Sequence, residues 1–283
     1  MYNLSGKVAI VTGSGRPHGL GQGIAKRLAK EGADVVVVDI CKPYEVYEGE
    51  VPEVGRGTWE ELLERKKEIE ALGVRSLAVK CDATDEQDVD AMVAAVVKEF
   101  GHIDILCNNI GGGHPRAGGP LLEVNSWGWD QGMAVNFKTA HLCSRAVAKQ
   151  MIAQGKGGKI VSTASQAGVK PFPMLGMYCS AKAALVMYTK VLALELAPYK
   201  INVNVIGPGT IETDMLKEAF SSMAKKYIGI TYEQIIEQTL PTIPLGRLQT
   251  PEDVANIAVW LVSPEADYIT GVYVLTTGGQ TII

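Results

Sequence analysis

Short apolar runs and longer amphipathic stretches alternate along the whole chain. Runs of Val, Ile and Leu without polar interruption predict strands buried on both faces, and the helical patterns between them predict crossover helices. This alternation predicts a single doubly wound α/β domain over residues 1–283, with a central parallel sheet of about seven strands and helices on both faces. We expect strands in the segments VAIVT, ADVVVVDI, SLAVKCD, IDILCNN, KIVSTAS, INVNVIGPG and VYVLTTGG, and helices at GLGQGIAKRLAKEG and near 58–71, 85–100, 126–153, 178–197 and 251–262.

The composition is that of an ordinary globular protein with one large domain. Of the 283 residues, 47% are hydrophobic and 20% are charged, and the net charge of −4 offers no basic surface to a nucleic acid. No apolar run approaches the roughly 18 residues that a membrane span requires, and the start MYNLSG lacks the features of a secretion signal. The five cysteines show no CxxC spacing, so neither a disulfide framework nor a metal site is expected. These features predict a cytoplasmic protein without nucleic-acid or membrane partners.

The stretch Ser162–Lys182 contains candidate chemistry, because Tyr178 and Lys182 lie four residues apart where a helical pattern continues. On a helix, residues i and i+4 share a face, so the phenol and the ammonium can point into one cleft. A nearby cation favours the phenolate and is expected to lower the pKa of Tyr178, which makes this residue a candidate general acid or base. The pair alone is unspecific, because about every second chain of this size contains one by chance. A half-exposed helix face is the alternative interpretation.

A glycine-rich turn, Thr12–Gly21, joins the first strand to the first helix. Glycines let the backbone approach a pyrophosphate, whose charge then meets the amino end of the helix, so this position favours a dinucleotide over a plain turn. Asp39 ends the second strand, where a carboxylate can accept hydrogen bonds from the adenosine ribose and repel a 2′-phosphate. NAD is therefore favoured over NADP. Arg16 or Lys42 could still approach a 2′-phosphate, and Asp39 could simply cap its strand.

Two further residues extend the pattern. Ser165 lies thirteen residues before Tyr178 at the end of a strand-like run, and Asn136 lies in a helical stretch between the glycine turn and that run. Taken in this order, the features resemble the short-chain dehydrogenase/reductase family over residues 7 to about 279. The resemblance implies a Rossmann-type fold and an NAD-dependent oxidoreductase that interconverts a secondary alcohol and a ketone.

The resemblance implies four catalytic roles. Tyr178 would exchange a proton with the substrate oxygen, and Ser165 would hydrogen-bond that oxygen. Lys182 would lower the pKa of Tyr178 and hold the nicotinamide ribose, while Asn136 would place a relay water. Two rivals are an NAD-binding redox sensor without catalysis, and an epimerase or dehydratase with the same Tyr-x-x-x-Lys pair. The complete set argues against the sensor, because binding alone needs no proton donor, and the expected lack of a large substrate domain argues against the epimerase.

The resemblance also implies how the cofactor is held. Asp82 would bind the adenine, the segment Asn108–Gly111 would lie along the adenine ribose, and Gly207–Thr213 would hold the nicotinamide carboxamide and a phosphate. One departure is the glycine turn, where the five residues 14–18 replace the usual three and should bulge outward. The predicted cofactor-binding residues are Gly13, Ser14, Gly15, His18, Gly19, Leu20, Asp39, Asp82, Ala83, Asn109, Gly111, Tyr178, Lys182, Pro208, Gly209, Ile211 and Thr213.

Three irregular segments are expected around the cleft. Residues 41–57 form an insertion expected at the surface, and the Gly- and Pro-rich loop 111–120 leaves a strand end and should border the substrate. Residues 214–243 suit a substrate lid, with packing against the core as the alternative. The candidate substrate contacts are His114, Gln166, Met174, Leu175 and Met215.

The long helices near 126–153 and 178–197 carry apolar residues on more than one face, so part of this surface should need a partner. The family resemblance implies a homotetramer, which would act on a small-molecule alcohol or ketone. The apolar residues of these helices include Phe137, Leu142, Leu185, Val186, Tyr188 and Leu192.

Overall fold

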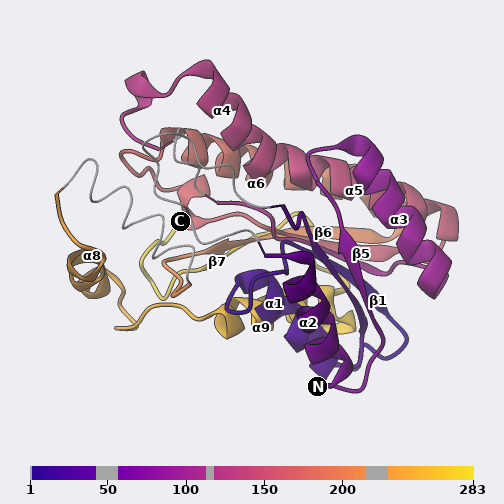
Figure 1. Cartoon of the computed structure of the whole chain (residues 1–283). Helices are drawn as coiled ribbons and strands as arrows, with labels where there is room; N and C mark the ends of the chain where they lie inside the picture. Colours follow the sequence, from indigo (N-terminus) through magenta and orange to yellow (C-terminus); the bar gives the residue numbers. More distant parts are fainter. Residues whose placement is uncertain (1, 43–56, 113–117, 214–228) are drawn as a thin grey trace.

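The computed structural model describes residues 2–42, 57–112, 118–213 and 229–283, which are built around one seven-stranded parallel sheet (Figure 1). The strand order is β3-β2-β1-β4-β5-β6-β7. This confirms the parallel sheet that the apolar runs predict. The strands are β1 (Val8–Thr12), β2 (Asp34–Asp39), β3 (Ser76–Lys80), β4 (Ile105–Asn108), β5 (Gly158–Thr163), β6 (Ile201–Pro208) and β7 (Tyr273–Thr276).

The sheet grows outward in both directions from β1, which pairs with β2 on one side and with β4 on the other. Residues 8–12 lie opposite 34–38, and residues 9–11 lie opposite 105–107. The connections that follow β1 and β4 therefore leave in opposite directions and open a crevice at the carboxyl ends of these two strands. In doubly wound sheets this crevice is where a ligand binds.

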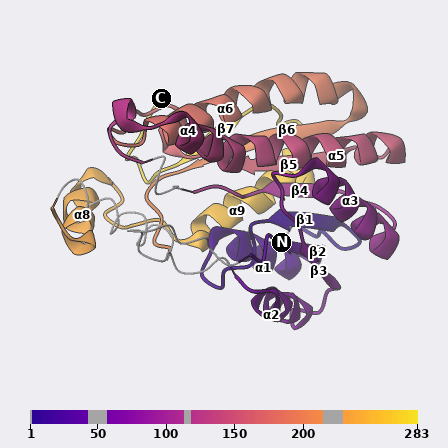
Figure 2. The same cartoon turned by 45° about the horizontal axis from the view of Figure 1, so that its top comes forward.

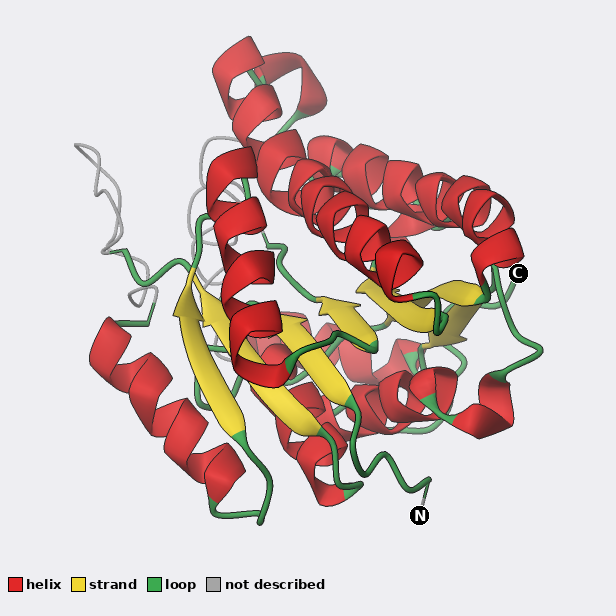
Figure 3. Ribbon diagram, turned by 90° about the vertical axis from the view of Figure 1, so that its right-hand side faces the viewer, coloured by secondary structure: helices red, strands yellow, loops and turns green. Residues whose placement is uncertain are grey.

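Helices cover both faces of the sheet, as Figure 3 shows. Successive strand residues point to opposite faces. Ala9 and Val11 therefore pack in one core with α1, α2 and α9, while Val8 and Ile10 pack in the other with α3, α5 and α6. A strand between two helix layers needs apolar residues at every position, which explains the unbroken runs. The helices are α1 (Leu20–Lys30), α2 (Trp59–Glu70), α3 (Glu86–Phe100), α4 (Ser126–Met133), α5 (Thr139–Gln154), α6 (Gly176–Leu196), α8 (Tyr232–Thr239) and α9 (Pro251–Val262).

The stretch predicted as one helix near 126–153 contains an irregular turn. α4 is followed by a π-helical turn, η2 (Ala134–Lys138), and then by α5. Within this turn Asn136 directs its amide to the backbone of Gly112 and Gly132. Turns of this kind widen a helix locally and are frequent at functional sites. Hydrophobic periodicity does not reveal the turn, because the flanking residues keep a helical backbone.

Two helices begin at reciprocal capping pairs. At the start of α2, Thr58 accepts a hydrogen bond from the backbone N–H of Glu61, and the Glu61 carboxylate accepts one from the N–H of Thr58. Thr250 and Asp253 make the same reciprocal pair at the start of α9. These bonds satisfy backbone N–H groups that the first turn of a helix leaves unpaired.

Two predicted surface features are described only in part. Residues 43–56 of the expected insertion and residues 214–228 of the expected lid lie outside the described residues. The described end of the lid consists of α8 and the short turn η6 (Leu240–Thr242), and α8 stands apart from the helix layers in Figure 2. Among the described residues, no helix is long and apolar enough to cross a membrane.

Candidate active site

Four side chains that the sequence predicts to act together meet at the carboxyl ends of the strands, which we call the carboxyl edge of the sheet. Tyr178 and Lys182 lie one turn apart on α6, Ser165 follows β5, and Asn136 comes from the π-helical turn η2. Three elements that are far apart in the chain thus supply one set of groups.

Ser165 is held in place from several sides. Its side chain is hydrogen-bonded to the phenol of Tyr178. Its hydroxyl also accepts a hydrogen bond from the backbone N–H of Ala167 at 3.2 Å, at the start of the short turn η3 (Gln166–Gly168). Its backbone carbonyl accepts a further bond from the hydroxyl of Tyr273 on β7. The position of Ser165 therefore depends on both the loop after β5 and the last strand.

Burial decides the ionisation of Tyr178. Burial raises the pKa of this phenol above its ordinary value, and the hydrogen bond with Ser165 opposes the shift only in part. The expectation that Lys182 lowers the pKa of Tyr178 is therefore wrong for this structure. The Lys182 ammonium lies 5.5 Å from the centre of the tyrosine ring, and its hydrogen bond goes to the carbonyl of Thr163 at 3.1 Å rather than to the phenol.

Lys182 is an unusual cation because it is 2% exposed. Burial lowers the pKa of its ammonium to about 8. Within the described part of the chain, this ammonium has the carbonyl of Thr163 as its hydrogen-bond partner and no carboxylate in ion-pair distance. A lysine with a pKa this close to neutrality can gain and lose a proton under working conditions.

Close packing around position 111 explains why a glycine is there. A β-carbon on Gly111 would lie 2.7 Å from Nζ of Lys182 and 3.0 Å from Oδ1 of Asn136. The buried amide of Asn136 accepts a hydrogen bond from the N–H of Gly112 at 2.9 Å and donates to the carbonyls of Gly112 at 2.9 Å and Gly132 at 3.0 Å. Asn136 therefore fixes the loop that leaves β4 and lies near Lys182.

The glycine turn lies at the same edge. Gly13 has a φ of +66°, and a β-carbon on Gly21 would lie 2.2 Å from the carbonyl oxygen of Gly13. Only glycine lets α1 begin this close to β1. Asn109 donates its side-chain N–H to the same carbonyl at 3.2 Å, so this predicted cofactor residue also clamps the turn. The Ser14 hydroxyl is buried and joins β1 to β2, so it does not face the crevice.

Asp39 lies at the end of β2 beside this turn. Its Oδ2 accepts a hydrogen bond from the N–H of Gly15 at 2.9 Å, and its Oδ1 accepts one from the N–H of Ile40 at 2.8 Å. Each carboxylate oxygen keeps a further lone pair with which it can accept a bond from a ribose hydroxyl. Arg16 is half-buried and His18 is exposed in the lengthened turn.

Asp82 and Lys42 are engaged with each other, since Oδ2 of Asp82 lies 3.0 Å from Nζ of Lys42. The other carboxylate oxygen of Asp82 accepts hydrogen bonds from the N–H of Thr84 at 3.1 Å and its hydroxyl at 2.6 Å. Through these contacts Asp82 closes the end of β3, and Lys42 has a partner other than a 2′-phosphate. Ala83 is buried in the core.

The segment after β6 is held by neighbouring loops. The N–H of Gly209 donates to the carbonyl of Thr276 at 3.1 Å and to Oε1 of Gln249 at 3.2 Å, and Ile211 pairs with Gln249 in a short bridge. Pro208 is the last residue of β6. The predicted nicotinamide loop therefore starts at the carboxyl edge. Gln249 could not be predicted from the sequence, because no local pattern links it to a residue 40 positions away.

Only some of the predicted substrate contacts lie among the described residues. His114 and Met215 lie outside the described residues. Met174 has a φ of +71°, a left-handed backbone that is unusual for a residue other than glycine, and its carbonyl accepts a hydrogen bond from the N–H of Gly119 at 2.9 Å. Leu175 directly precedes α6. Met174 and Leu175 therefore lie in the loop of the chain that joins Ser165 to Tyr178.

Gln166 is 4% exposed, and both ends of its amide are occupied. Its Nε2 donates to Oε1 of Gln280 at 2.8 Å, and its Oε1 accepts from the hydroxyl of Thr281 at 2.6 Å. These partners could not be predicted from the sequence, because they lie more than 110 residues later in the chain. A side chain with both ends engaged is poorly suited to bind a substrate directly.

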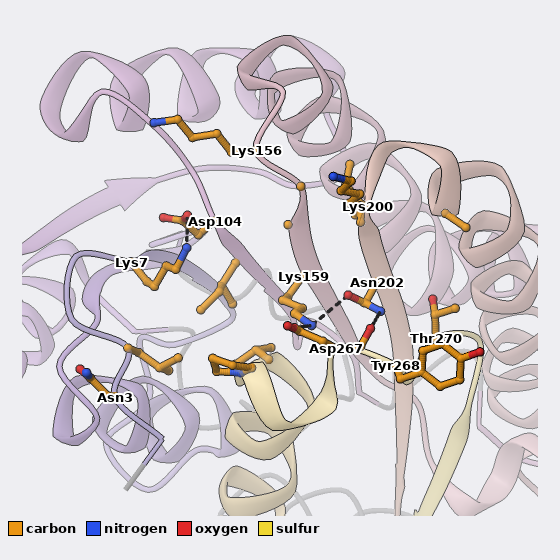
Figure 4. A pocket seen from close by; sticks show the side chains of 18 residues that line it. Asn3, Lys7, Asp104, Lys156, Lys159, Lys200, Asn202, Asp267, Tyr268 and Thr270 are labelled. Carbon is orange, nitrogen blue, oxygen red and sulfur yellow. Dashed lines mark hydrogen bonds and ion pairs between the residues drawn. The ribbon is translucent and has the colours of Figure 1, made fainter.

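A separate hollow of about 730 Å³ lies at the opposite, amino edge of the sheet (Figure 4). Two of its cations are paired, because Lys7 lies 3.0 Å from Asp104 and Lys159 lies 2.7 Å from Asp267. Lys156 points away from these pairs in Figure 4. None of the predicted site residues lines this hollow, so it lies apart from the candidate chemistry.

Comparisons with known proteins match almost the whole chain. A family model described as Enoyl-(Acyl carrier protein) reductase matches residues 13–281. A galactitol 2-dehydrogenase of Agrobacterium fabrum is 34% identical over 98% of both chains. An NAD-dependent glycerol dehydrogenase of Listeria innocua is 36% identical over 99% of this chain and 96% of its own length. The crystal structure of carveol dehydrogenase from Mycobacterium avium in complex with NAD has a TM-score of 0.89, at 27% identity, and the match covers 99% of both chains.

Proposed function

The chain belongs to the short-chain dehydrogenase/reductase family, and on this basis we propose that it interconverts a secondary alcohol and a ketone by NAD-dependent hydride transfer, with Tyr178 as general acid and base. The observation that carries the proposal is the contact of Tyr178 with Ser165 beside the buried Lys182. In reduction the phenol gives its proton to the carbonyl oxygen, and in oxidation it takes the proton of the alcohol. Ser165 hydrogen-bonds the same oxygen.

The residues at the carboxyl edge fit an NAD molecule. Gly13 and Gly21 leave bare backbone at the amino end of α1, where a pyrophosphate is stabilised. Asp39 would accept hydrogen bonds from the adenosine ribose, and Lys182 would hold the nicotinamide ribose. When bound, the cofactor accepts or donates the hydride. We propose NAD rather than NADP, because the charge of Asp39 opposes a 2′-phosphate and Lys42 is already paired with Asp82.

The proton of Tyr178 needs a route to solvent. Burial favours the protonated phenol, which is the form required to reduce a ketone. Lys182 is one helical turn away, and its pKa of about 8 lets it pass a proton on at working pH. Asn136 lies next to Lys182 across Gly111 and would hold the water that continues the route.

For the substrate, we propose a small polyhydroxy alcohol or the corresponding ketone. The support is that two relatives, matched over almost their whole length, are named for galactitol and glycerol. The test is NADH formation, followed by absorbance, with polyols, hydroxysteroids, hydroxyacyl thioesters and aromatic alcohols. We expect the highest kcat/KM with a polyol.

The same assay separates the rival functions. NADH that binds without any turnover across the panel would support the redox-sensing alternative. Conversion of a nucleotide sugar without net change of NADH would support the epimerase or dehydratase. Turnover of another alcohol class would keep the oxidoreductase and overturn the polyol assignment.

We further propose a homotetramer in the cytoplasm, where the five cysteines, all free, would stay reduced. Leu142, Leu185 and Val186, which the sequence marked as surplus apolar residues, are buried within the subunit. The exposed apolar surface of α6 consists instead of Met187, Val191 and Leu194. These three side chains recur every three to four residues and so form one face that a partner could cover. Light scattering should give about four times the chain mass of 30.3 kDa, and a monomer mass would contradict the proposal.

A further inference from the structure

The chain after β7 returns to the loop that follows the catalytic serine. Residues 277–281 lie next to the short turn η3, which begins at Gln166, and next to the segment after β6. The hydroxyl of Thr277 folds this piece on itself, because it donates to the carbonyl of Thr281 at 3.0 Å and accepts from the N–H of Thr281 at 3.2 Å. The two side chains that reach out from it are those of Gln280 and Thr281.

The amide of Gln280 joins three separate loops. Its Oε1 accepts hydrogen bonds from Nε2 of Gln166 at 2.8 Å and from the hydroxyl of Thr210 at 3.2 Å. Its Nε2 donates to the hydroxyl of Thr242 in η6 at 2.9 Å. One side chain therefore connects the catalytic loop after β5, the proposed nicotinamide loop after β6, and the described end of the proposed lid.

Thr281 completes the grip on Gln166. Its hydroxyl donates to Oε1 of Gln166 at 2.6 Å, so the buried amide is bonded at both ends. A buried amide that loses one partner is left unsatisfied and drives a rearrangement of its loop. Gln166 directly follows Ser165, whose carbonyl is held by Tyr273 of β7. Because the two residues share a peptide bond, a rearrangement of the Gln166 backbone alters the direction in which the Ser165 side chain points.

We propose that Gln280 and Thr281 are positioning residues for the reaction, acting through Gln166 to hold the Ser165 hydroxyl against Tyr178. The inference rests on the proposed function, and it reassigns Gln166 from substrate contact to positioning residue. The bond with Ser165 is the contact that lowers the pKa of the Tyr178 phenol against the effect of burial. Loosening the loop therefore raises the pKa of Tyr178 further and misplaces the hydrogen-bond donor for the substrate oxygen.

The test uses two pairs of variants. Gln280→Leu removes the amide at nearly constant size, and Gln150→Leu is its matched control, because among the described residues the Gln150 side chain bonds only its helix neighbour Gln154 on α5, at 3.0 Å. Thr281→Val removes the hydroxyl, whereas Thr281→Ser keeps it. Each variant is assayed for kcat, KM, NADH affinity and thermal unfolding, and the kcat of alcohol oxidation is followed against pH.

We expect Gln280→Leu and Thr281→Val to lower kcat by roughly tenfold or more, as a misplaced catalytic group does. The pH at which the kcat of alcohol oxidation reaches half its maximum should increase by as much as about one pH unit, because one hydrogen bond to the phenol is weakened. NADH affinity should change much less. Gln150→Leu and Thr281→Ser should stay within about twofold of the parent in kcat and keep its pH profile.

A measurement that does not depend on enzyme activity separates this inference from the proposed function. The ionisation of Tyr178 is measured as the ultraviolet tyrosinate signal that is lost in Tyr178→Phe, in each background. A parent protein without activity would overturn the function, while the shift of this signal would still decide the inference. Equal tyrosinate titrations and equal kcat in Thr281→Val and Thr281→Ser would overturn the inference. This outcome decides the question even where Gln280→Leu does not fold.

Discussion

At the amino edge of the sheet Lys7 and Lys159 each lie within 3.0 Å of a carboxylate, whereas at the carboxyl edge the buried Lys182 bonds a backbone carbonyl. The first arrangement is the ordinary one, in which partly exposed charges are neutralised by a neighbour. The second is costly, because a buried cation without a counter-charge loses its hydration. Burial lowers the pKa of Lys182 from the ordinary lysine value of 10.5 to about 8. The comparison supports the proposal that the chemistry takes place at the carboxyl edge.

The largest expected effect is a loss of activity when the tyrosine of the carboxyl edge is replaced, compared with the same replacement at the amino edge. Tyr178→Phe should lower kcat by roughly 10²–10⁴-fold, because it removes the proton donor and leaves the ring in place. NADH affinity, measured by fluorescence titration, should stay nearly unchanged. Tyr268→Phe at the amino edge is the control, since Tyr268 is fully exposed and lines the hollow there. A Tyr178→Phe enzyme with more than about a tenth of the parent activity would mean that another group supplies the proton.

The lysines should differ next. Lys182→Ala should lower kcat by about 10²–10³-fold, because it interrupts the proton route, and it should also weaken NADH binding by removing a ribose contact. Lys159→Ala removes a partly exposed ion pair with Asp267 and a hydrogen bond to Asn202, and it should change stability by about 1–2 kcal/mol without affecting turnover. Steady-state rates and NADH titrations of both variants check this. Unchanged NADH affinity in Lys182→Ala would remove the ribose contact from the mechanism.

The buried charge also predicts how stability depends on pH. Below pH 8 the folded protein carries a buried Lys182 ammonium, and between about pH 8 and the ordinary lysine value of 10.5 only the unfolded chain keeps that proton. The contribution of Lys182 to the free energy of unfolding therefore rises with pH across this window, by up to roughly 3 kcal/mol. Lys182→Met should be more stable than the parent at pH 7, and the difference should shrink by pH 10. Urea unfolding of both proteins at the two pH values measures it, and a constant difference would contradict the buried charge.

The smallest expected effect concerns the carboxylates. Asp39→Ala should improve the ratio of NADP to NAD use, in kcat/KM, by about tenfold, because it removes a negative charge that would face the 2′-phosphate. Asp267→Ala removes a carboxylate at the amino edge and should leave the ratio unchanged. A parent enzyme that already prefers NADP would show that Asp39 does not select the cofactor.

Several features followed from the sequence because their partners lie within a few residues. The capping pair of Thr58 and Glu61 is three residues apart, and Tyr178 and Lys182 share a helix face at a spacing of four. The apolar run Val35–Val38 is continuous because successive strand residues enter opposite cores. Such patterns are set by backbone geometry alone, so the strands and most helices could be predicted, whereas the catalytic roles of Ser165 and Asn136 come from the family resemblance and stay a proposal.

Other features were decided only by tertiary packing. The pKa of Tyr178 moves up rather than down, because burial outweighs the hydrogen bond with Ser165, while the Lys182 ammonium bonds the carbonyl of Thr163 instead of the phenol. The partner of Gln166 is Gln280, 114 residues later, and no local signal selects it from the other amides. Desolvation and long-range hydrogen bonds depend on which surfaces the folded chain brings together, and that choice is made by the packing of whole elements rather than by neighbours in sequence.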